Sequence, residues 1–240
     1  MRTTLLAALV FIVNICLAQR PGYDDLKVLF ADGNYEKLIK SAEAYTQKES
    51  SKNDALPYYF LGQGYYKISL TNNKNPIYQN AYKDAISAFG NCIKRDVNGE
   101  VQRVFVVEIE EFKMSLVNKI AQNLASANYT EASTWVTKFY KLNQKSIGTN
   151  YLDGVCKYRA ANKAGAELVW KLADQGMSAL TDINTLGKAE ADLLKIGIMQ
   201  SADCFVADKQ VERAKTLMKK GKPFFEFEAD FMAKYKQIVK

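Results

Sequence analysis

Apolar side chains recur at helical spacing along most of this chain. Between residues 81 and 93 they follow the i, i+3, i+4, i+7 spacing of one buried helix face, at Tyr82, Ala85, Ile86, Phe89 and Ile93. Stretches 34–45 and 128–139 repeat the pattern, and their tyrosines Tyr35 and Tyr129 stand 47 residues before and after Tyr82. This even spacing predicts the same amphipathic helix three times.

A partner helix is predicted before each of these three helices, near 26–30, 56–70 and 101–124. The third begins with "VFVVEIE" at 104–110, a β-branched run that would suit a strand. Its apolar stripe nevertheless continues at helical spacing to Leu124, so we expect one continuous helix. Asn34 and Asn128 precede the later helices and suit turn and cap positions.

After residue 145 the even spacing fades, but helical patterns continue near 149–161, 164–182, 187–207, 209–221 and 224–239. No long linker divides the chain. Consecutive helix pairs at a near-constant period are typical of an α-solenoid. The sequence therefore predicts an all-α protein with one domain over 19–240, built from about five helix pairs and a C-terminal capping helix.

One helix pair resembles the tetratricopeptide repeat (TPR) family. The stretch "YYFLGQGY" at 58–65 places Leu61-Gly62 between aromatic residues, as in the W-x2-L-G-x2-Y of a TPR first helix, and Ala85 and Phe89 match the A-x3-F of the second. Weaker matches to this motif occur at 151–158, where Gly154 stands one residue before the motif's glycine position, and at 201–205, which is followed by Ala214 and Met218. An insertion at 71–81 makes this pair longer than a regular unit.

The resemblance implies binding of protein partners on a concave surface formed by the first helices. The groove-facing positions that it implies in the two clearer repeats are Tyr59, Gln63, Tyr66, Lys67, Leu152, Cys156 and Arg159. Five of these are predicted partner-binding residues: Tyr59, Gln63, Tyr66, Lys67 and Arg159. Alternatively, Tyr59 and Tyr66 pack under the 71–81 insertion.

Residues 1–18 have the features of a cleaved signal peptide. Arg2 is followed by an apolar run from Leu5 to Cys16, and small residues precede a cleavage point after Ala18. We therefore expect an exported, periplasmic protein, with an extracellular location or lipid anchoring at Cys16 as the alternatives. No later apolar stretch has the roughly 20 residues that a transmembrane helix needs.

Composition adds a mild positive charge and, after the predicted signal peptide, three cysteines to this picture. The net charge is +7, or +6 without Arg2, but the lysines are spread along the chain. This spread favours solvated helix faces over a site for an acidic partner or a membrane surface. Cys92, Cys156 and Cys204 stand among apolar residues, so we expect small buried hydrophobes rather than a disulfide framework.

Catalytic and cofactor motifs are not found. The chain has no histidine, which removes Ser-His-Asp and Cys-His catalysis and most helical zinc, haem and di-iron sites. The acidic clusters at 108–111 and 226–230 suit solvated surface better than a carboxylate-pair hydrolase, which stays a minor alternative. In "KKGKPFF" at 219–225, Gly221 is interpreted as a helix stop with Pro223 beyond it.

These features predict a non-catalytic scaffold that binds protein segments, without a cofactor, a metal or nucleic acid. The alternative is a structural subunit of a cell-envelope complex that uses the ends or the convex face of the solenoid.

Overall fold

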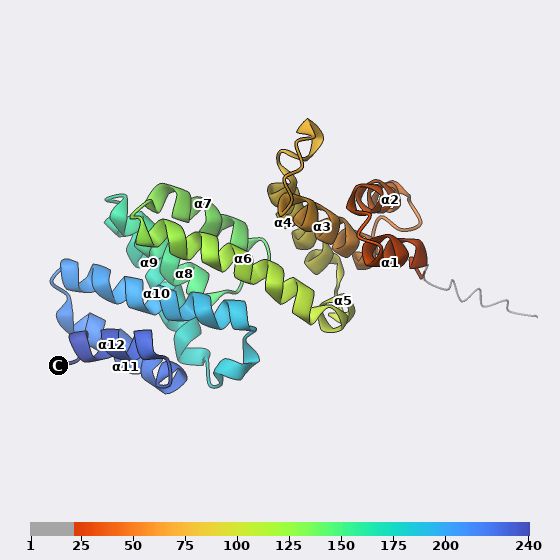
Figure 1. The fold of residues 1–240 in the computed structure, drawn as a ribbon. Coiled ribbons are helices and arrows are strands. Elements are labelled where there is room, and N and C mark those ends of the chain that lie inside the picture. Colours follow the sequence, from red (N-terminus) through yellow and green to blue (C-terminus); the bar gives the residue numbers. More distant parts are fainter. Residues whose placement is uncertain (1–21) are drawn as a thin grey trace, which may run out of the picture.

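The structure is a computed structural model that describes residues 22–240. These residues form twelve α-helices and two short 3-10 helices and contain no β-strand, so the all-α class is confirmed (Figure 1). The predicted signal peptide, with its cleavage point and Cys16, lies outside the described residues. Within 22–240, no helix combines the length and apolar character needed to cross a membrane.

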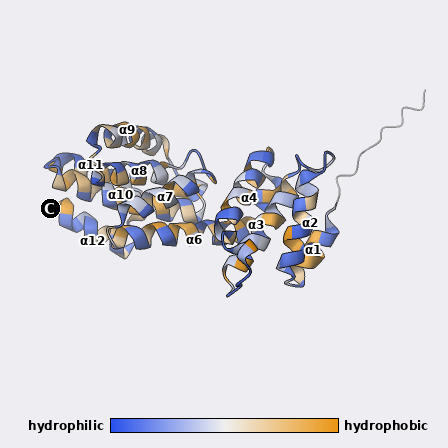
Figure 2. Cartoon of the chain, turned by 90° about the horizontal axis from the view of Figure 1, so that it is seen from above, coloured by the Kyte–Doolittle hydropathy of each residue, from blue (hydrophilic) through white to orange (hydrophobic). Residues whose placement is uncertain are grey.

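The helices form an N-terminal half and a C-terminal half joined by α5 and α6 (Figures 1 and 2). The N-terminal half comprises α1 (Asp24–Ala31), α2 (Tyr35–Gln47), α3 (Ala55–Ser69), η1 (Pro76–Tyr78) and α4 (Ala81–Arg95). The joining helices are α5 (Glu100–Val104) and α6 (Val106–Ala125). The C-terminal half comprises α7 (Tyr129–Tyr140), α8 (Ile147–Arg159), α9 (Lys163–Ala179), η2 (Ile183–Thr185), α10 (Lys188–Ala207), α11 (Val211–Phe225) and α12 (Ala229–Ile238).

Most helices pack against their neighbours in sequence. The closest pairs are α2 with α3, α3 with α4, α8 with α9, and α10 with both α8 and α11. An additional contact joins α6 to α10, which is not adjacent in the sequence. The core runs through both halves as one connected set of buried side chains.

The evenly spaced tyrosines stand at helix starts, as predicted. α2 begins at Tyr35, α7 begins at Tyr129, and Tyr82 is the second residue of α4. Two of them pack on the preceding helix: the ring of Tyr35 lies 6.3 Å from that of Phe30, and Tyr82 lies 6.2 Å from Tyr66. Tyr129 differs, because its ring faces the guanidinium of Arg159 in the following helix pair.

Two glycines allow paired helices to approach closely. A Cβ atom at Gly62 of α3 would lie 2.9 Å from the ring of Phe89 in α4, so only glycine fits there. Gly154 of α8 has the same relation to the indole of Trp170 in α9. Ala85 and Phe89 have the spacing of Ala166 and Trp170. The same packing arrangement is therefore used twice, and Gly154 occupies the position of close approach.

The helix expected over 101–124 is interrupted at Phe105. This residue has φ −112° and ψ 34°, which ends α5 before α6 starts. Its ring stacks on Tyr59 at a centroid distance of 4.0 Å and contacts Phe60 at 6.0 Å. The prediction of a continuous helix is wrong here, because burial of Phe105 against α3 bends the chain at this point.

The predicted helix stop at Gly221 is also wrong, because α11 continues through Pro223 to Phe225. Gly221 instead provides space, since a Cβ atom there would lie 2.9 Å from the ring of Phe231. Pro223 stands in the last turn of α11 and has no backbone N–H, so the helix continues there with one i→i−4 hydrogen bond fewer. Phe225 is buried 5.3 Å from Phe231, which keeps the last turn of α11 against α12.

Cys92, Cys156 and Cys204 are free and buried, as expected. Burial raises the pKa of the Cys92 and Cys156 thiols to about 12 and that of Cys204 to about 11. All three therefore stay protonated near neutral pH and act as core side chains.

Candidate functional site

The predicted groove residues of α3 lie inside the protein. Tyr59 and Gln63 are 0% exposed and Tyr66 is 5% exposed. Tyr59 stacks on Phe105, and Tyr66 meets the ring of Phe112 edge-on at 5.0 Å. The expectation of an open groove on α3 is corrected, because α5 and α6 pack directly over these side chains.

The other two predicted residues, Lys67 and Arg159, reach the surface at different places. Lys67 of α3 places its ammonium 3.2 Å from the carboxylate of Glu111 on α6. Arg159 of α8 is exposed and lies over the ring of Tyr129 on α7, 5.3 Å from its centroid. Both cations join neighbouring helices, and they do not form one site with Tyr59. Leu152 and Cys156, the remaining positions implied by the TPR resemblance, are buried.

Polar atoms without partners are buried beneath α5 and α6. The hydroxyl of Tyr59 and the amide of Gln63 lie close enough for Gln63 to lower the pKa of Tyr59, but neither side chain makes a hydrogen bond of good geometry within residues 22–240. Burial, followed by the negative charge of Glu108, raises the pKa of Tyr59, so this phenol stays neutral. An unpaired buried polar group costs about 1–3 kcal/mol, so this part of the core is less stable than its aromatic packing alone would make it.

Replacing Gln63 with leucine is expected to raise the free energy of unfolding by about 1 kcal/mol, because it removes the unpaired amide and keeps most of the volume. Chemical denaturation followed by circular dichroism measures the change. Gln63→Glu is the matched control and should lower stability by at least about 2 kcal/mol, because it buries a carboxyl group without a partner. A loss of more than about 1 kcal/mol in Gln63→Leu would mean that the amide is hydrogen-bonded in solution.

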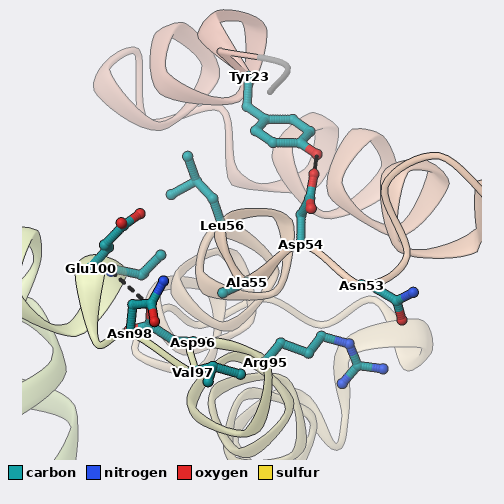
Figure 3. A pocket seen from close by; sticks show the side chains of 11 residues that line it. Tyr23, Asn53, Asp54, Ala55, Leu56, Arg95, Asp96, Val97, Asn98 and Glu100 are labelled. Atoms are coloured by element: carbon teal, nitrogen blue, oxygen red, sulfur yellow. Dashed lines mark hydrogen bonds between the residues drawn. The ribbon is translucent and has the colours of Figure 1, made fainter. Parts of the chain in front are cut away.

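A cavity of about 280 Å³ lies between the start of α1, the loop before α3 and the α4–α5 turn (Figure 3). Its polar groups are engaged in holding these turns together. Tyr23 donates a hydrogen bond of 2.5 Å to Asp54, and Asp96 accepts hydrogen bonds from the backbone N–H groups of Val101 and Gln102. Arg95 donates to the backbone carbonyl of Lys52. We therefore assign the polar side chains of this cavity a structural role and not a ligand-binding one.

A larger open groove of about 760 Å³ lies between α4, α6 and the connection from α7 to α8. Four lysines and four side-chain amides contribute to its lining: Lys94, Lys113, Lys141, Lys145, Asn91, Gln102, Asn143 and Gln144. None of the residues that line it is acidic. We call this feature the basic groove.

The charges of the basic groove are only partly neutralised. Lys113 lies 3.2 Å from Glu110 of the same helix, and its own side chain is only 13% exposed. Lys94, Lys141 and Lys145 form no ion pair within residues 22–240. Three cations therefore face solvent around the groove without a counter-charge of their own.

The positive surface continues beyond the groove along α4 and α7. Burial, followed by the positive charge of Lys83, lowers the pKa of Lys138, with smaller contributions from Lys141 and Lys119 and an opposing one from Glu131, so these lysines are close enough to repel. The ammonium of Lys138 lies 3.9 Å from the centroid of the Trp135 ring, which partly stabilises it there. The basic groove is thus one end of a longer cationic strip.

Carboxylates behind the groove fix its walls. Glu110 of α6 accepts a hydrogen bond of 3.0 Å from the backbone N–H of Ala189 at the start of α10. Glu190 is 5% exposed, and burial raises the pKa of its carboxyl group, while nearby Ser146 and Asn143 lower it. The hydrogen bond of Glu110 connects α6 to α10, and Glu190 places a buried carboxyl group of α10 close to the α7–α8 connection.

The acidic clusters noted in the sequence hold helices together. Glu111 pairs with Lys67 of α3, and Glu228 and Asp230 both pair with Lys195 of α10. In the part of the chain that the structure describes, no three cysteine or carboxylate side chains are grouped so as to hold a metal ion. We assign these carboxylates a structural role.

No protein-family model matches this chain, and no curated protein matches it significantly.

The basic groove was missed in the sequence because its lysines come from three separate segments. One signal was present. On α4, Lys83, Ser87, Asn91 and Lys94 form a polar stripe at helical spacing, and "KFYKLNQK" at 138–145 contains three lysines and no acid. Only the fold shows that these two segments face each other.

Proposed function

We propose that this chain is an exported, non-catalytic scaffold of TPR-like helix pairs that binds a protein partner. The observation that carries the proposal is the basic groove, an open hollow at the junction of successive helix pairs that is lined by side-chain amides and by four lysines, three of them without an ion pair in residues 22–240. Such a surface can hold a polypeptide segment by hydrogen bonds and charge. It needs no cofactor or metal.

A TPR-like solenoid is supported by the repeated close packing within helix pairs. In two pairs, an aromatic ring of the second helix occupies the space that a side chain on a glycine of the first helix would need. These contacts are Phe89 on Gly62 and Trp170 on Gly154. In this proposal the pairs are α1–α2, α3–α4, α5/α6–α7, α8–α9 and α10–α11, with α12 as the cap. The break at Phe105 and the contact of α6 with α10 are departures from a regular array.

The location of the groove favours a specific alternative. It lies along α4, the second helix of its pair, whereas the TPR family presents its first helices to partners. A structural subunit of a cell-envelope complex that uses its convex face would bind in this way. Both functions are binding functions, and they differ in the face that a partner covers.

The proposal is tested by affinity isolation of the full-length tagged protein from its native envelope fraction, after chemical crosslinking in cells. We expect the protein in the exported fraction and crosslinks that map to α4 and to residues 141–145. Crosslinks on the first helices would favour the concave face instead. Retention in the cytoplasm, or the absence of any specific crosslinked protein, would contradict the proposal.

A further inference from the structure

We infer that the basic groove binds an extended, carboxylate-rich segment of a partner protein. The inference rests on the proposed function and specifies the chemistry of the partner. It is argued from the charge, the amides and the dimensions of the groove.

The positive charge of the basic groove disfavours binding of basic or neutral polypeptide segments. Lys94, Lys141 and Lys145 are not neutralised by ion pairs within residues 22–240, and no acidic residue lines the groove. An isolated cationic cluster repels further positive charge and attracts carboxylates over about a Debye length, roughly 8 Å in physiological salt. The only lysine in the lining with a paired carboxylate is Lys113. The site is therefore complementary to Asp and Glu side chains.

The side-chain amides favour a polypeptide over other polyanions. Asn91, Gln102, Asn143 and Gln144 each carry both a donor and an acceptor, as the backbone of an extended chain does. Ile86 and Leu142 add apolar surface to the same lining. No aromatic residue lines the groove, so the stacking platform typical of single-stranded nucleic-acid sites is missing from it.

The concave shape argues against a membrane as the partner. A bilayer surface is met best by a flat or convex basic face with apolar side chains that enter the interface. The basic groove is a hollow of about 760 Å³ between three elements, within the usual size range of ligand sites. An inserted chain uses such a hollow, whereas a planar lipid surface does not reach its floor.

The length of the cationic strip sets the length of the segment. From Lys83 to Lys94, α4 advances about 16 Å at 1.5 Å per residue. An extended chain covers this distance with about five residues. A run of five or six acidic residues could therefore contact the strip along its whole length.

The test uses the mature full-length protein and a fluorescein-labelled peptide of six glutamates between Ser-Gly ends. We expect saturable binding by fluorescence anisotropy that weakens as salt is raised, and no binding of the matched six-glutamine peptide. The variant Lys94→Gln/Lys141→Gln/Lys145→Gln should weaken binding at least about tenfold, because it removes three charge pairs with the peptide whose small contributions add.

A matched control keeps the same change in net charge. Lys171, Lys220 and Lys236 are exposed residues of the C-terminal half that make no ion pair within residues 22–240, and changing all three to glutamine should leave binding within about twofold. Equal weakening by both triple variants would overturn the inference, since only net charge would then matter. Absence of binding by the unmodified protein would also overturn it.

Two further arms separate this inference from its rivals and from the proposed function. Phosphatidylglycerol vesicles should not compete with the glutamate peptide, and vesicle binding that depends on the three groove lysines would reassign the groove to a membrane surface. If the crosslinked native partner is retained by the groove variant, the scaffold function stands and the acidic-segment inference falls. If no partner is recovered with either protein while the peptide still binds, the proposed function fails alone.

Discussion

Replacing Phe112 with alanine is expected to lower the free energy of unfolding by about 4 kcal/mol, the largest effect of any single truncation that we predict. The side chain is fully buried where α6 meets both α3 and α4. Its ring stacks on Phe89 at 4.4 Å, meets Tyr66 at 5.0 Å and lies 5.8 Å from Tyr82. Removal leaves a cavity at the junction of the two halves, and denaturant titration measures the loss.

Phe227 supplies the matched control for this prediction. It is 95% exposed, and Phe227→Ala should change stability by less than about 0.5 kcal/mol. Similar losses for the two variants would show that the junction of α6 with α3 and α4 is not packed in solution. Limited proteolysis gives a second measurement, because Phe112→Ala should make residues 99–110 more accessible to cleavage.

Gly148→Ala is expected to cost about 3 kcal/mol through overpacking. A Cβ atom on Gly148 of α8 would lie 2.5 Å from the backbone nitrogen of Leu194 and 2.6 Å from the carbonyl carbon of Leu193. These are backbone atoms of α10, so no side-chain rotation can relieve the clash and the two helices must separate. For a chain of this size the midpoint of thermal unfolding should fall by about 6–12 °C.

Gly90→Ala is the appropriate control, since the substitution is the same and the glycine also lies within a helix. The nearest atom to a Cβ there is the carbonyl oxygen of Lys141 at 3.5 Å, an ordinary contact. Alanine has a higher helix propensity, so stability should stay unchanged or rise by up to about 1 kcal/mol. A large loss in Gly90→Ala, or none in Gly148→Ala, would contradict the arrangement of α4, α8 and α10 described above.

Helical periodicity was sufficient to predict the all-α class and the approximate positions of most helices. Tyr35, Tyr82 and Tyr129 mark helix starts because their apolar stripes begin there, and Gly62 of the TPR-like stretch lies where α3 approaches the ring of Phe89. These features are local, or depend on one neighbouring helix. Periodicity gives the buried face of a helix and usually its ends.

The predicted exposure of the site residues on α3 was wrong, because the exposure of a side chain depends on which other elements cover its helix. The TPR resemblance placed Tyr59 and Gln63 on an open face, but it gave no information about the direction in which the chain turns after α5. Phe105 decides this by packing on Tyr59. Gly221 and Pro223 were misinterpreted for a similar reason: contacts of Phe225 and Gly221 with Phe231, more than one turn away in the chain, outweigh their local preference for a helix end.

The contact of α6 with α10 has a consequence for the way in which the chain unfolds. In a helical array where each pair touches only its neighbours, the ends can fray independently and unfolding can proceed pair by pair. Here Glu110 of α6 holds the first turn of α10, which is 79 residues further along the chain. Because α8 also packs against α7 and α10, unfolding of the α8–α9 pair would remove contacts from the helices before and after it. Residues 106–207 should protect their amide hydrogens as a single cooperative unit, and α1 and α2 should exchange first.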